Sequence, residues 1–381
     1  MNLELHIIQN FAPANLNRDD TGSPKSCEFG GYRRARISSQ AIKRAIRKEF
    51  RDQELIPQAN QAVRSKRIVD KLAEQLAEGG RDLEQAKGVA EAGLALLNIK
   101  LAREGKTQYL LYLAPAELQA IAAFCEARWD ALAAAAAGEK RGKKDAKDAE
   151  TKQLADELNE ALDGGRAADL ALFGRMLADL PERNVNAASQ VAHAISTHQV
   201  GIEFDYYTAV DDLKPEDTAG ADMIGHVEFN SACYYRYANI DLSELRKNLK
   251  GDGELAEAAV RAFLIASRDA IPTGKQNSFA ARNAPSFVFA VVRDRGAWSL
   301  ANAFVQPVRG TDPEGLIGGS IAALDRHWRD LCAMYGEPEG ATLSVCAVGE
   351  APLNALLPAR VDTFGELVEK TLNAVRPALV S

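Results

Sequence analysis

Hydrophobic and polar positions alternate at the start of the chain. Leu3, Leu5 and Ile7 fall on one face at a period of two, which predicts a strand over residues 3–8. A stretch rich in Asn, Asp and Gly follows at residues 15–31 and predicts an irregular polar loop. The chain therefore opens with a strand and a long loop.

The next hydrophobic positions have helical spacing. Ser38 or Ser39 can cap a helix that runs to about residue 51. At about 100° per residue, one arc of this helix is apolar and the opposite arc is cationic. The apolar arc holds Ile42, Ala45, Ile46 and Phe50, and the cationic arc holds Lys43, Arg44, Arg47, Lys48 and Arg51. We expect the apolar face to pack on a core and the cationic face to stay outside.

Residues 54–192 have the composition of helices. Apolar residues such as Ile68, Leu72 and Leu76 recur at helical intervals in a segment rich in Ala, Leu, Glu and Lys. A charged run at 138–145 has mixed signs and no aromatic residue, which predicts a solvated connection. We predict an inserted helical domain over residues 54–195.

Strand character returns after this insert. Strands are predicted at residues 203–208 and 229–240, and the arm between them, at 211–226, has the Pro and Gly content of a β-hairpin extension. Met223 and Ile224 stand near the far end of this arm. Apolar residues at such a tip either make core contacts or wedge between nucleic-acid bases.

The remaining elements predict an α+β fold. A helix at 254–269 and a strand at 287–292 follow, and helices around 319–335 and 363–375 with a strand at 341–348 end the chain. Without the insert, the order is strand, helix, strand, strand, helix, strand, the ferredoxin-like order of RNA-recognition modules. The predicted palm of this type comprises residues 1–53 and 196–298, with the hairpin at about 200–229, and is completed by residues 299–381.

Positive charge is concentrated in one place. The chain of 381 residues has a formal net charge of −7, which repels polyanions at long range. Residues 33–51, however, hold eight basic residues and one acidic residue, a local net charge of +7. Such a basic segment on an acidic molecule favours selective contact with phosphates. A solvated surface helix is the alternative, although such helices usually mix charges of both signs.

The sequence favours a cytoplasmic protein. It contains neither a secretion signal nor an apolar run of membrane-spanning length. Its five cysteines are widely scattered, without the short spacing of a zinc or redox site.

No motif predicts catalysis, a metal or a cofactor. The Gly-Lys pair at 274–275 lacks the rest of a phosphate-binding loop, and His193 and His198 are expected to have structural roles. Asp19 and Asp20 could bind Mg²⁺ beside the basic segment, so a metal-dependent ribonuclease is the alternative function. Loop-organising acceptors are the simpler interpretation, because no further acidic ligands can be identified. A scaffold for duplex RNA or protein is a third hypothesis.

Several short runs carry a family resemblance. In chain order they are residues 16–20 (LNRDD), 29–40 (FGGYRRARISSQ), 192–200 (AHAISTHQV), 209–213 (AVDDL), 235–240 (YRYANI), 274–276 (GKQ) and 299–304 (SLANAF). With these runs the chain resembles the CasC-type backbone subunit of the type I-E CRISPR surveillance complex, Cascade. The matches extend over almost the whole chain.

The resemblance implies a non-catalytic subunit with a modified RNA-recognition palm, an inserted helical domain and a thumb hairpin. Several copies would stack head to tail along the guide RNA, beside other Cascade subunits, and each thumb would interrupt the base stack so that segments pair with target DNA. The implied RNA-binding residues in the palm and its loops are Arg18, Lys25, Arg34, Arg36, Ser38, Ser39, Gln40, Lys43, Arg44, Arg47, Lys275 and Gln276. Ile224, with Met223 beside it, and Met176 match apolar residues that separate bases.

Overall fold

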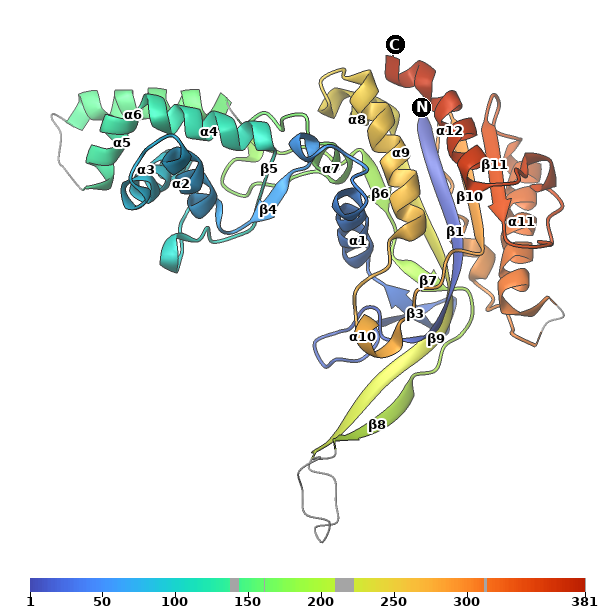
Figure 1. Cartoon of the computed structure of the whole chain (residues 1–381). Coiled ribbons are helices and arrows are strands. Elements are labelled where there is room, and N and C mark those ends of the chain that lie inside the picture. Colours follow the sequence, from blue (N-terminus) through green and yellow to red (C-terminus); the bar gives the residue numbers. More distant parts are fainter. Residues whose placement is uncertain (138–143, 161, 210–222, 312–313, 381) are drawn as a thin grey trace, which may run out of the picture. The chain divides into compact units, whose positions relative to one another are not determined.

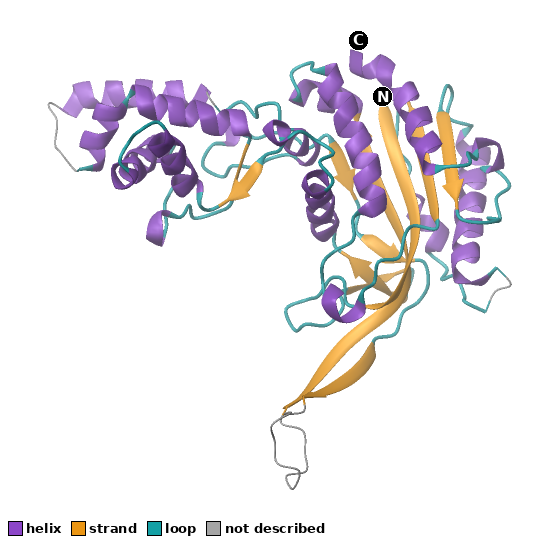
Figure 2. Cartoon of the chain, viewed as in Figure 1, coloured by secondary structure: helices purple, strands orange, loops and turns teal. Residues whose placement is uncertain are grey.

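The computed structural model describes residues 1–137, 144–160, 162–209, 223–311 and 314–380 (Figures 1 and 2). Contacts divide the chain into two compact units. The first unit comprises Met1–Gln53, Ser189–Leu242 and Val260–Ser381, and the second comprises Glu54–Ala188 and Ser243–Ala259.

The first unit is built around an antiparallel β-sheet whose strands differ in length. Its strands follow the order β11-β10-β1-β9-β7-β3-β2, and β6 and β8 also pair with β9. The strands are β1 (Asn2–Ala14), β2 (Ser26–Phe29), β3 (Tyr32–Ile37), β6 (Ser189–Val191), β7 (Ala194–Ser196), β8 (Glu203–Ala209), β9 (Met223–Asp241), β10 (Phe287–Arg293) and β11 (Thr342–Ala347).

The middle of this sheet has the predicted ferredoxin-like arrangement. β10, β1, β9 and the pair β6/β7 lie in that order, with α1 (Ser39–Asp52) following β1 and α9 (Gly253–Asp269) lying between β9 and β10 in the chain. The fold class is therefore confirmed. The predicted helices and strands at 39–51, 254–269, 287–292 and 341–348 agree with α1, α9, β10 and β11 to within two residues.

The strand predicted at residues 203–208 is present, but it belongs to the hairpin and is not the palm strand of the ferredoxin-like order. Residues 203–208 form β8, which pairs with the far part of β9, from Glu203 opposite Phe229 to Ala209 opposite Met223, as a hairpin. The palm position expected for this strand is filled by β6 and β7, which lie at the end of the predicted insert, with only Ser196 beyond it. β6 and β7 have three residues each, too short to show a periodic pattern. Residues 210–222, the rest of the predicted arm, lie outside the described residues.

Helices cover both faces of the sheet. On one face, Ile42 and Ile46 of α1 lie beside Leu5 and Ile7 of β1. On the other, Trp328 of α11 packs edge-on against Phe289, with ring centroids 5.1 Å apart. The other helical elements of this unit are α10 (Gln276–Phe279), η4 (Leu300–Phe304), α11 (Gly315–Tyr335), η5 (Leu357–Ala359) and α12 (Phe364–Val380).

The predicted polar loop at 15–31 contains a hairpin. β2 and β3 pair through a two-residue turn at Gly30 and Gly31, both with positive φ (62° and 80°). A Gly-Gly pair between Phe29 and Tyr32 is a hairpin signal in the sequence, because such tight turns require positive φ. Arg33 to Arg36 therefore lie on a strand, where successive side chains point to opposite faces.

A polar cluster is buried in the centre of the first unit. Glu4, fully buried, lies 2.7 Å from the guanidinium of Arg293, and its other oxygen accepts from the hydroxyl of Tyr237. His6, also fully buried, lies 2.9 Å from the hydroxyl of Tyr235 and stacks on Phe289. Burial, with a smaller effect of Arg293, lowers the pKa of His6 to about 3. The imidazole is therefore neutral at physiological pH.

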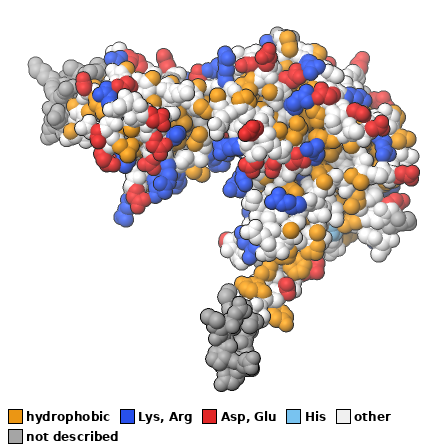
Figure 3. All heavy atoms as spheres, in the orientation of Figure 1, with side chains coloured by type: hydrophobic (Ala, Val, Ile, Leu, Met, Phe, Trp, Pro, Cys, Tyr) orange, Lys and Arg blue, Asp and Glu red, His pale blue; other side chains and the backbone are white. Residues whose placement is uncertain are grey.

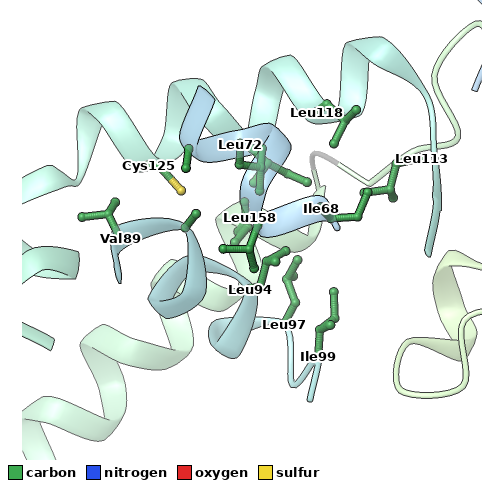
Figure 4. Packing of buried hydrophobic residues seen from close by; sticks show 14 of the residues in the cluster. Ile68, Leu72, Val89, Leu94, Leu97, Ile99, Leu113, Leu118, Cys125 and Leu158 are labelled. Carbon is green, nitrogen blue, oxygen red and sulfur yellow. The ribbon is translucent and has the colours of Figure 1, made fainter. Parts of the chain in front are cut away.

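The second unit is mainly helical, as predicted for the insert. Its longer elements surround one hydrophobic core that includes Ile68, Leu72, Leu94 and Leu158 (Figure 4). The unit contains η1 (Gln58–Asn60), β4 (Val63–Ser65), α2 (Ile68–Glu78), α3 (Leu83–Leu96), η2 (Arg103–Gly105), β5 (Leu111–Leu113), α4 (Pro115–Ala127), α5 (Trp129–Ala136), α6 (Lys144–Glu160), α7 (Ala168–Phe173), η3 (Pro181–Arg183), most of α8 (Leu242–Asn248) and the beginning of α9. None of the helices in the described ranges is long and apolar enough to span a membrane.

Candidate nucleic-acid interface

The loop after β1 is fixed to the start of α1. The side-chain oxygen of Asn17 accepts from the backbone N–H of Ser38 (2.8 Å), and the Asn17 carbonyl accepts from Lys25 (2.9 Å). The Lys25 carbonyl in turn accepts from the N–H of Arg36 (2.9 Å). These bonds bring Arg18, Lys25 and Arg36 to the N-terminal end of α1.

Helix α1 has the predicted two-sided character. Its apolar residues Ile42, Ala45, Ile46 and Phe50 are buried. Arg44 is exposed, Lys43 and Arg47 are half-buried, and burial lowers the pKa of Lys43. The cationic side of the helix is therefore not packed inside the first unit.

His193, the residue before β7, is hydrogen-bonded to the start of α1. Its Nδ1 accepts from the backbone N–H of Ser39 (2.8 Å). Burial, and then the charges of Arg36 and Lys25, hold its pKa below the ordinary value, which places both cations near the ring. His198 also has the structural role predicted for it, because its two ring nitrogens lie 2.8 Å from the Gln199 carbonyl and 3.3 Å from the Cys233 N–H.

A second loop joins this region. A Cβ on Gly274 would lie 2.3 Å from the carbonyl oxygen of Leu16, so the close approach of the two loops requires glycine. The next residue, Lys275, has a left-handed backbone (φ 50°) and a half-buried side chain. The side-chain nitrogen of Gln276 donates to the carbonyls of Pro272 and Ala281 (3.2 Å each). These hydrogen bonds hold together the loop in which Gln276 lies.

We call the resulting group of cations the palm surface. It holds those predicted cations whose side chains are exposed or half-buried, together with the exposed Gln40 and half-buried Ser39 at the helix start. Its cations are Arg18, Lys25, Arg36, Lys43, Arg44, Arg47 and Lys275. Five of them, namely Arg18, Lys25, Arg36, Arg44 and Lys275, have no carboxylate within 4.0 Å among the described residues.

The surroundings of Arg34 differ from those expected for an RNA-binding residue at this surface. Its side chain is fully buried, and its guanidinium donates to the carbonyls of Ser196 (3.2 Å), Phe304 (2.7 Å) and Val305 (3.1 Å). Nε donates to Phe29 at 3.4 Å. With these donors engaged inside the fold, Arg34 does not reach an external phosphate.

Ser38 also has an internal role. It is the N-cap of α1, and its hydroxyl accepts from the N–H of Ala41 (3.3 Å). The residue is 6% exposed. Its hydroxyl therefore serves the helix start, as N-cap serines generally do.

Asp19 organises its loop. One carboxylate oxygen accepts from the N–H and hydroxyl of Thr21 (2.9 and 2.7 Å) and from the N–H of Ser23 (3.0 Å). These bonds, the Thr21 hydroxyl first, hold the pKa of Asp19 below its usual range. Within the described ranges, no group of three His, Cys, Asp or Glu side chains has the arrangement of a metal site.

The β8–β9 hairpin carries exposed aromatic rings that are not among the predicted RNA-binding residues. Phe204 is 71% exposed, Tyr206 68% and Tyr207 46%, and hydrophobic side chains are visible on the described part of the hairpin in Figure 3. A Cβ on Gly225 would lie 2.4 Å from the Tyr207 ring, so this glycine accommodates the ring across the strand pair. The acidic and aromatic alternation of residues 203–207 was the signal in the sequence.

The three predicted wedge residues have different surroundings. In the second unit, Met176 is 81% exposed, although its neighbours Arg175 and Leu177 are buried. Arg175 is anchored by an ion pair with the buried Glu117 (2.8 Å). Met223 and Ile224 lie opposite Ala209 and Thr208 in the hairpin, and their side chains lie outside the described part of the structure.

Comparisons with known proteins agree on one family. A model of the CT1975-like protein family matches residues 3–370. A chain of a solved structure described as "CRISPR RNA-guided surveillance complex, pre-nicking" is 32% identical, with a TM-score of 0.84, and the match covers 98% of this chain and 100% of that one. A chain from another "CRISPR RNA-guided surveillance complex" is 30% identical, with a TM-score of 0.76 and the same coverage. None of the curated proteins searched matches the chain.

Proposed function

From the premise that the chain belongs to the CT1975-like protein family, we propose that it is a CasC-type backbone subunit of a type I-E Cascade complex. In this role it binds the sugar-phosphate backbone of the CRISPR guide RNA in the cytoplasm and has no catalytic activity. Several copies stack head to tail along one guide, in contact with the other Cascade subunits.

The palm surface is the observation that carries this proposal. The five palm cations without a carboxylate neighbour among the described residues stand on two loops, on β3 and on α1. The hydrogen bonds of Asn17 and the Gly274 contact hold these elements together. A guide of arbitrary sequence has to be gripped by its backbone, because base-edge contacts would restrict which guides can bind. Arg and Lys side chains beside a helix N-terminus match that requirement.

The hairpin and the wedge residues have a separate task in this proposal. Met176, Met223 and Ile224 interrupt the base stack, so that the segments between them pair with a target DNA strand. An apolar side chain replaces base stacking of about 1–3 kcal/mol per base. The high exposure of Met176 on an anchored backbone supports this role.

Removal of two palm charges tests the grip. We expect Arg36→Gln with Arg44→Gln to lower the salt slope of single-stranded RNA binding by about 1.4, because each phosphate contact on a single strand contributes about 0.7. The measurement is fluorescence anisotropy of an RNA probe over a salt series. Lys48→Gln with Arg51→Gln, on the far part of the same helix, is the matched control and should keep the slope. An unchanged slope in the palm variant would refute the proposed grip.

The ribonuclease hypothesis has its own test. The purified complex is incubated with complementary RNA and Mg²⁺, and the proposal expects intact RNA with the natural chain and with Asp19→Ala. Cleavage that disappears in Asp19→Ala or Asp20→Ala would establish the enzyme instead.

A further inference from the structure

His193 lies beside two cations of the palm surface. Arg36 of β3 is opposite Ile195 of β7, and Lys25, whose carbonyl accepts from the N–H of Arg36 (2.9 Å), flanks β3 on its other side. Residues opposite each other in antiparallel strands share a face, and so do residues two apart in extended chain. Lys25, Arg36 and His193 therefore project from the same face of the sheet. The lowering of the His193 pKa by partial burial, and then by these two charges, agrees with this placement.

The Nδ1 atom of His193 is already engaged. It accepts a hydrogen bond from the backbone N–H of Ser39, the first residue of α1 (2.8 Å). A nitrogen that accepts a hydrogen bond does not carry the proton of a neutral imidazole. Because the pKa of the ring lies below its ordinary value, the ring is neutral at physiological pH and its single proton is on Nε2. The start of α1 thus fixes the tautomer.

The Nε2–H group of His193 faces away from the fold. The side chain is exposed, and the bond to Ser39 is the only hydrogen bond that its ring makes to the described residues. His198 is the opposite case, because one of its ring nitrogens lies 2.8 Å from the Gln199 carbonyl and the other 3.3 Å from the Cys233 N–H. His198 is used inside the fold, whereas His193 presents a fixed donor to the outside.

The surroundings of this donor select an anion. In the part of the chain that the structure describes, Lys25 and Arg36 have no carboxylate within 4.0 Å, so their positive charge is available to a ligand. A phosphate oxygen is a strong acceptor for an N–H group, and the two cations strengthen the attraction. A third cation at this position would be repelled by the first two, whereas a neutral imidazole adds a directed hydrogen bond without that cost.

We propose that His193 binds a phosphate of the guide RNA through its Nε2–H group, as a neutral donor beside Lys25 and Arg36. The inference rests on the proposed guide binding and adds a further residue and a different kind of contact to it. Because the ring carries no charge, this contact strengthens binding without adding to the salt dependence. One ring thereby joins the start of α1 to the nucleic acid.

Two amide substitutions separate the two nitrogens of the ring. In His193→Asn, the side-chain oxygen takes the position of Nδ1 as the acceptor for the N–H of Ser39, and nothing replaces Nε2. In His193→Gln, the side-chain nitrogen reaches the position of Nε2 and donates there. The first variant therefore lacks only the outward donor, and the second variant restores it.

The measurement is fluorescence anisotropy of a single-stranded RNA probe with the full chain over a salt series. We expect His193→Asn to keep the unfolding midpoint and to bind the probe about tenfold more weakly at about 0.1 M salt, because a hydrogen bond to a charged oxygen is lost. Its salt slope should equal that of the natural chain. His193→Gln should recover most of the affinity.

His198→Asn is the matched control and should keep the RNA affinity, because both ring nitrogens of His198 have partners inside the fold. A second measurement needs no variant to fold. In the natural chain with isotope-labelled histidine, NMR should show the proton of His193 on Nε2, and this signal should shift when the RNA probe is added.

Natural RNA affinity in His193→Asn would overturn the inference, as would a loss that comes with a smaller salt slope or that His193→Gln does not restore. An Nε2 signal that ignores the RNA would overturn it as well. The palm variant Arg36→Gln with Arg44→Gln keeps the two proposals apart. A natural salt slope in that variant refutes the grip itself, whereas a reduced slope there with natural binding by His193→Asn removes only the role of His193.

Discussion

The palm surface and residues 64–67 and 100–106 of the second unit all contain short basic stretches, but the fold uses their cations differently. In the palm, Arg34 is fully buried among carbonyl oxygens, whereas Arg36, two residues later on the same strand, remains at the surface. In the two stretches of the second unit, no arginine or lysine is buried. The difference teaches that a cation in a basic run becomes structural where neighbouring segments supply enough acceptors to replace its hydration.

Loss of Arg34 should have the largest effect. Arg34→Met leaves buried carbonyls without their donor, and we expect the unfolding free energy to fall by about 3–5 kcal/mol. Urea unfolding followed by Trp fluorescence measures it, since Trp298 and Trp328 both belong to the first unit. The exposed neighbour Arg33→Met should change stability by less than about 0.5 kcal/mol. Equal effects would remove the distinction between buried and surface cations.

The Val305 carbonyl links this site to the β2–β3 turn. A Cβ on Gly30 would lie 2.3 Å from the oxygen that accepts from Arg34, and φ there is +62°. We expect Gly30→Ala to lower stability by about 2–3 kcal/mol in the same unfolding assay. Gly31→Ala, also at positive φ but with open space around it, should lower stability by about 1 kcal/mol. A smaller effect at Gly30 than at Gly31 would contradict the proposed close approach.

His6 extends the comparison to a buried side chain that cannot keep a charge. Its folded pKa of about 3 lies below the ordinary value of 6.5, so only the unfolded chain takes up the proton as pH falls between these values. Stability is unaffected by this group above pH 6.5 and falls below it, by roughly 2 kcal/mol at pH 5. The midpoints of urea unfolding above pH 6.5 and at pH 5 measure this loss of stability. His6→Gln should remove most of the difference, and an unchanged pH dependence in that variant would exclude His6 as the cause.

The variant with the smallest expected effect tests whether Ser38 caps the helix or contacts a phosphate. Ser38→Ala should lower stability by about 1 kcal/mol, because the hydroxyl that accepts from Ala41 is lost. The salt slope of RNA binding should stay unchanged, in contrast to the Arg36 and Arg44 variant. A reduced slope with full stability would place Ser38 on the nucleic acid.

Several features followed from the sequence because each depends on a local pattern. The spacing of Ile42, Ala45, Ile46 and Phe50 fixed both the extent of α1 and the face that carries its cations. The alternation of apolar and polar residues at 3–8 was likewise sufficient to predict β1, and the helical spacing of apolar residues was sufficient to predict the helices of the insert. The order of these elements led to the fold class.

Other features depend on which segments meet. The sequence does not show that carbonyls of Ser196, Phe304 and Val305 surround Arg34, because they come from segments more than 150 residues away. The same holds for β6 and β7, whose place in the sheet is set by pairing with β9, and for Lys66, which Thr107 joins to the second basic stretch. Periodicity determines which face of an element is apolar, but only packing determines whether a polar side chain on it meets solvent or a ring of acceptors.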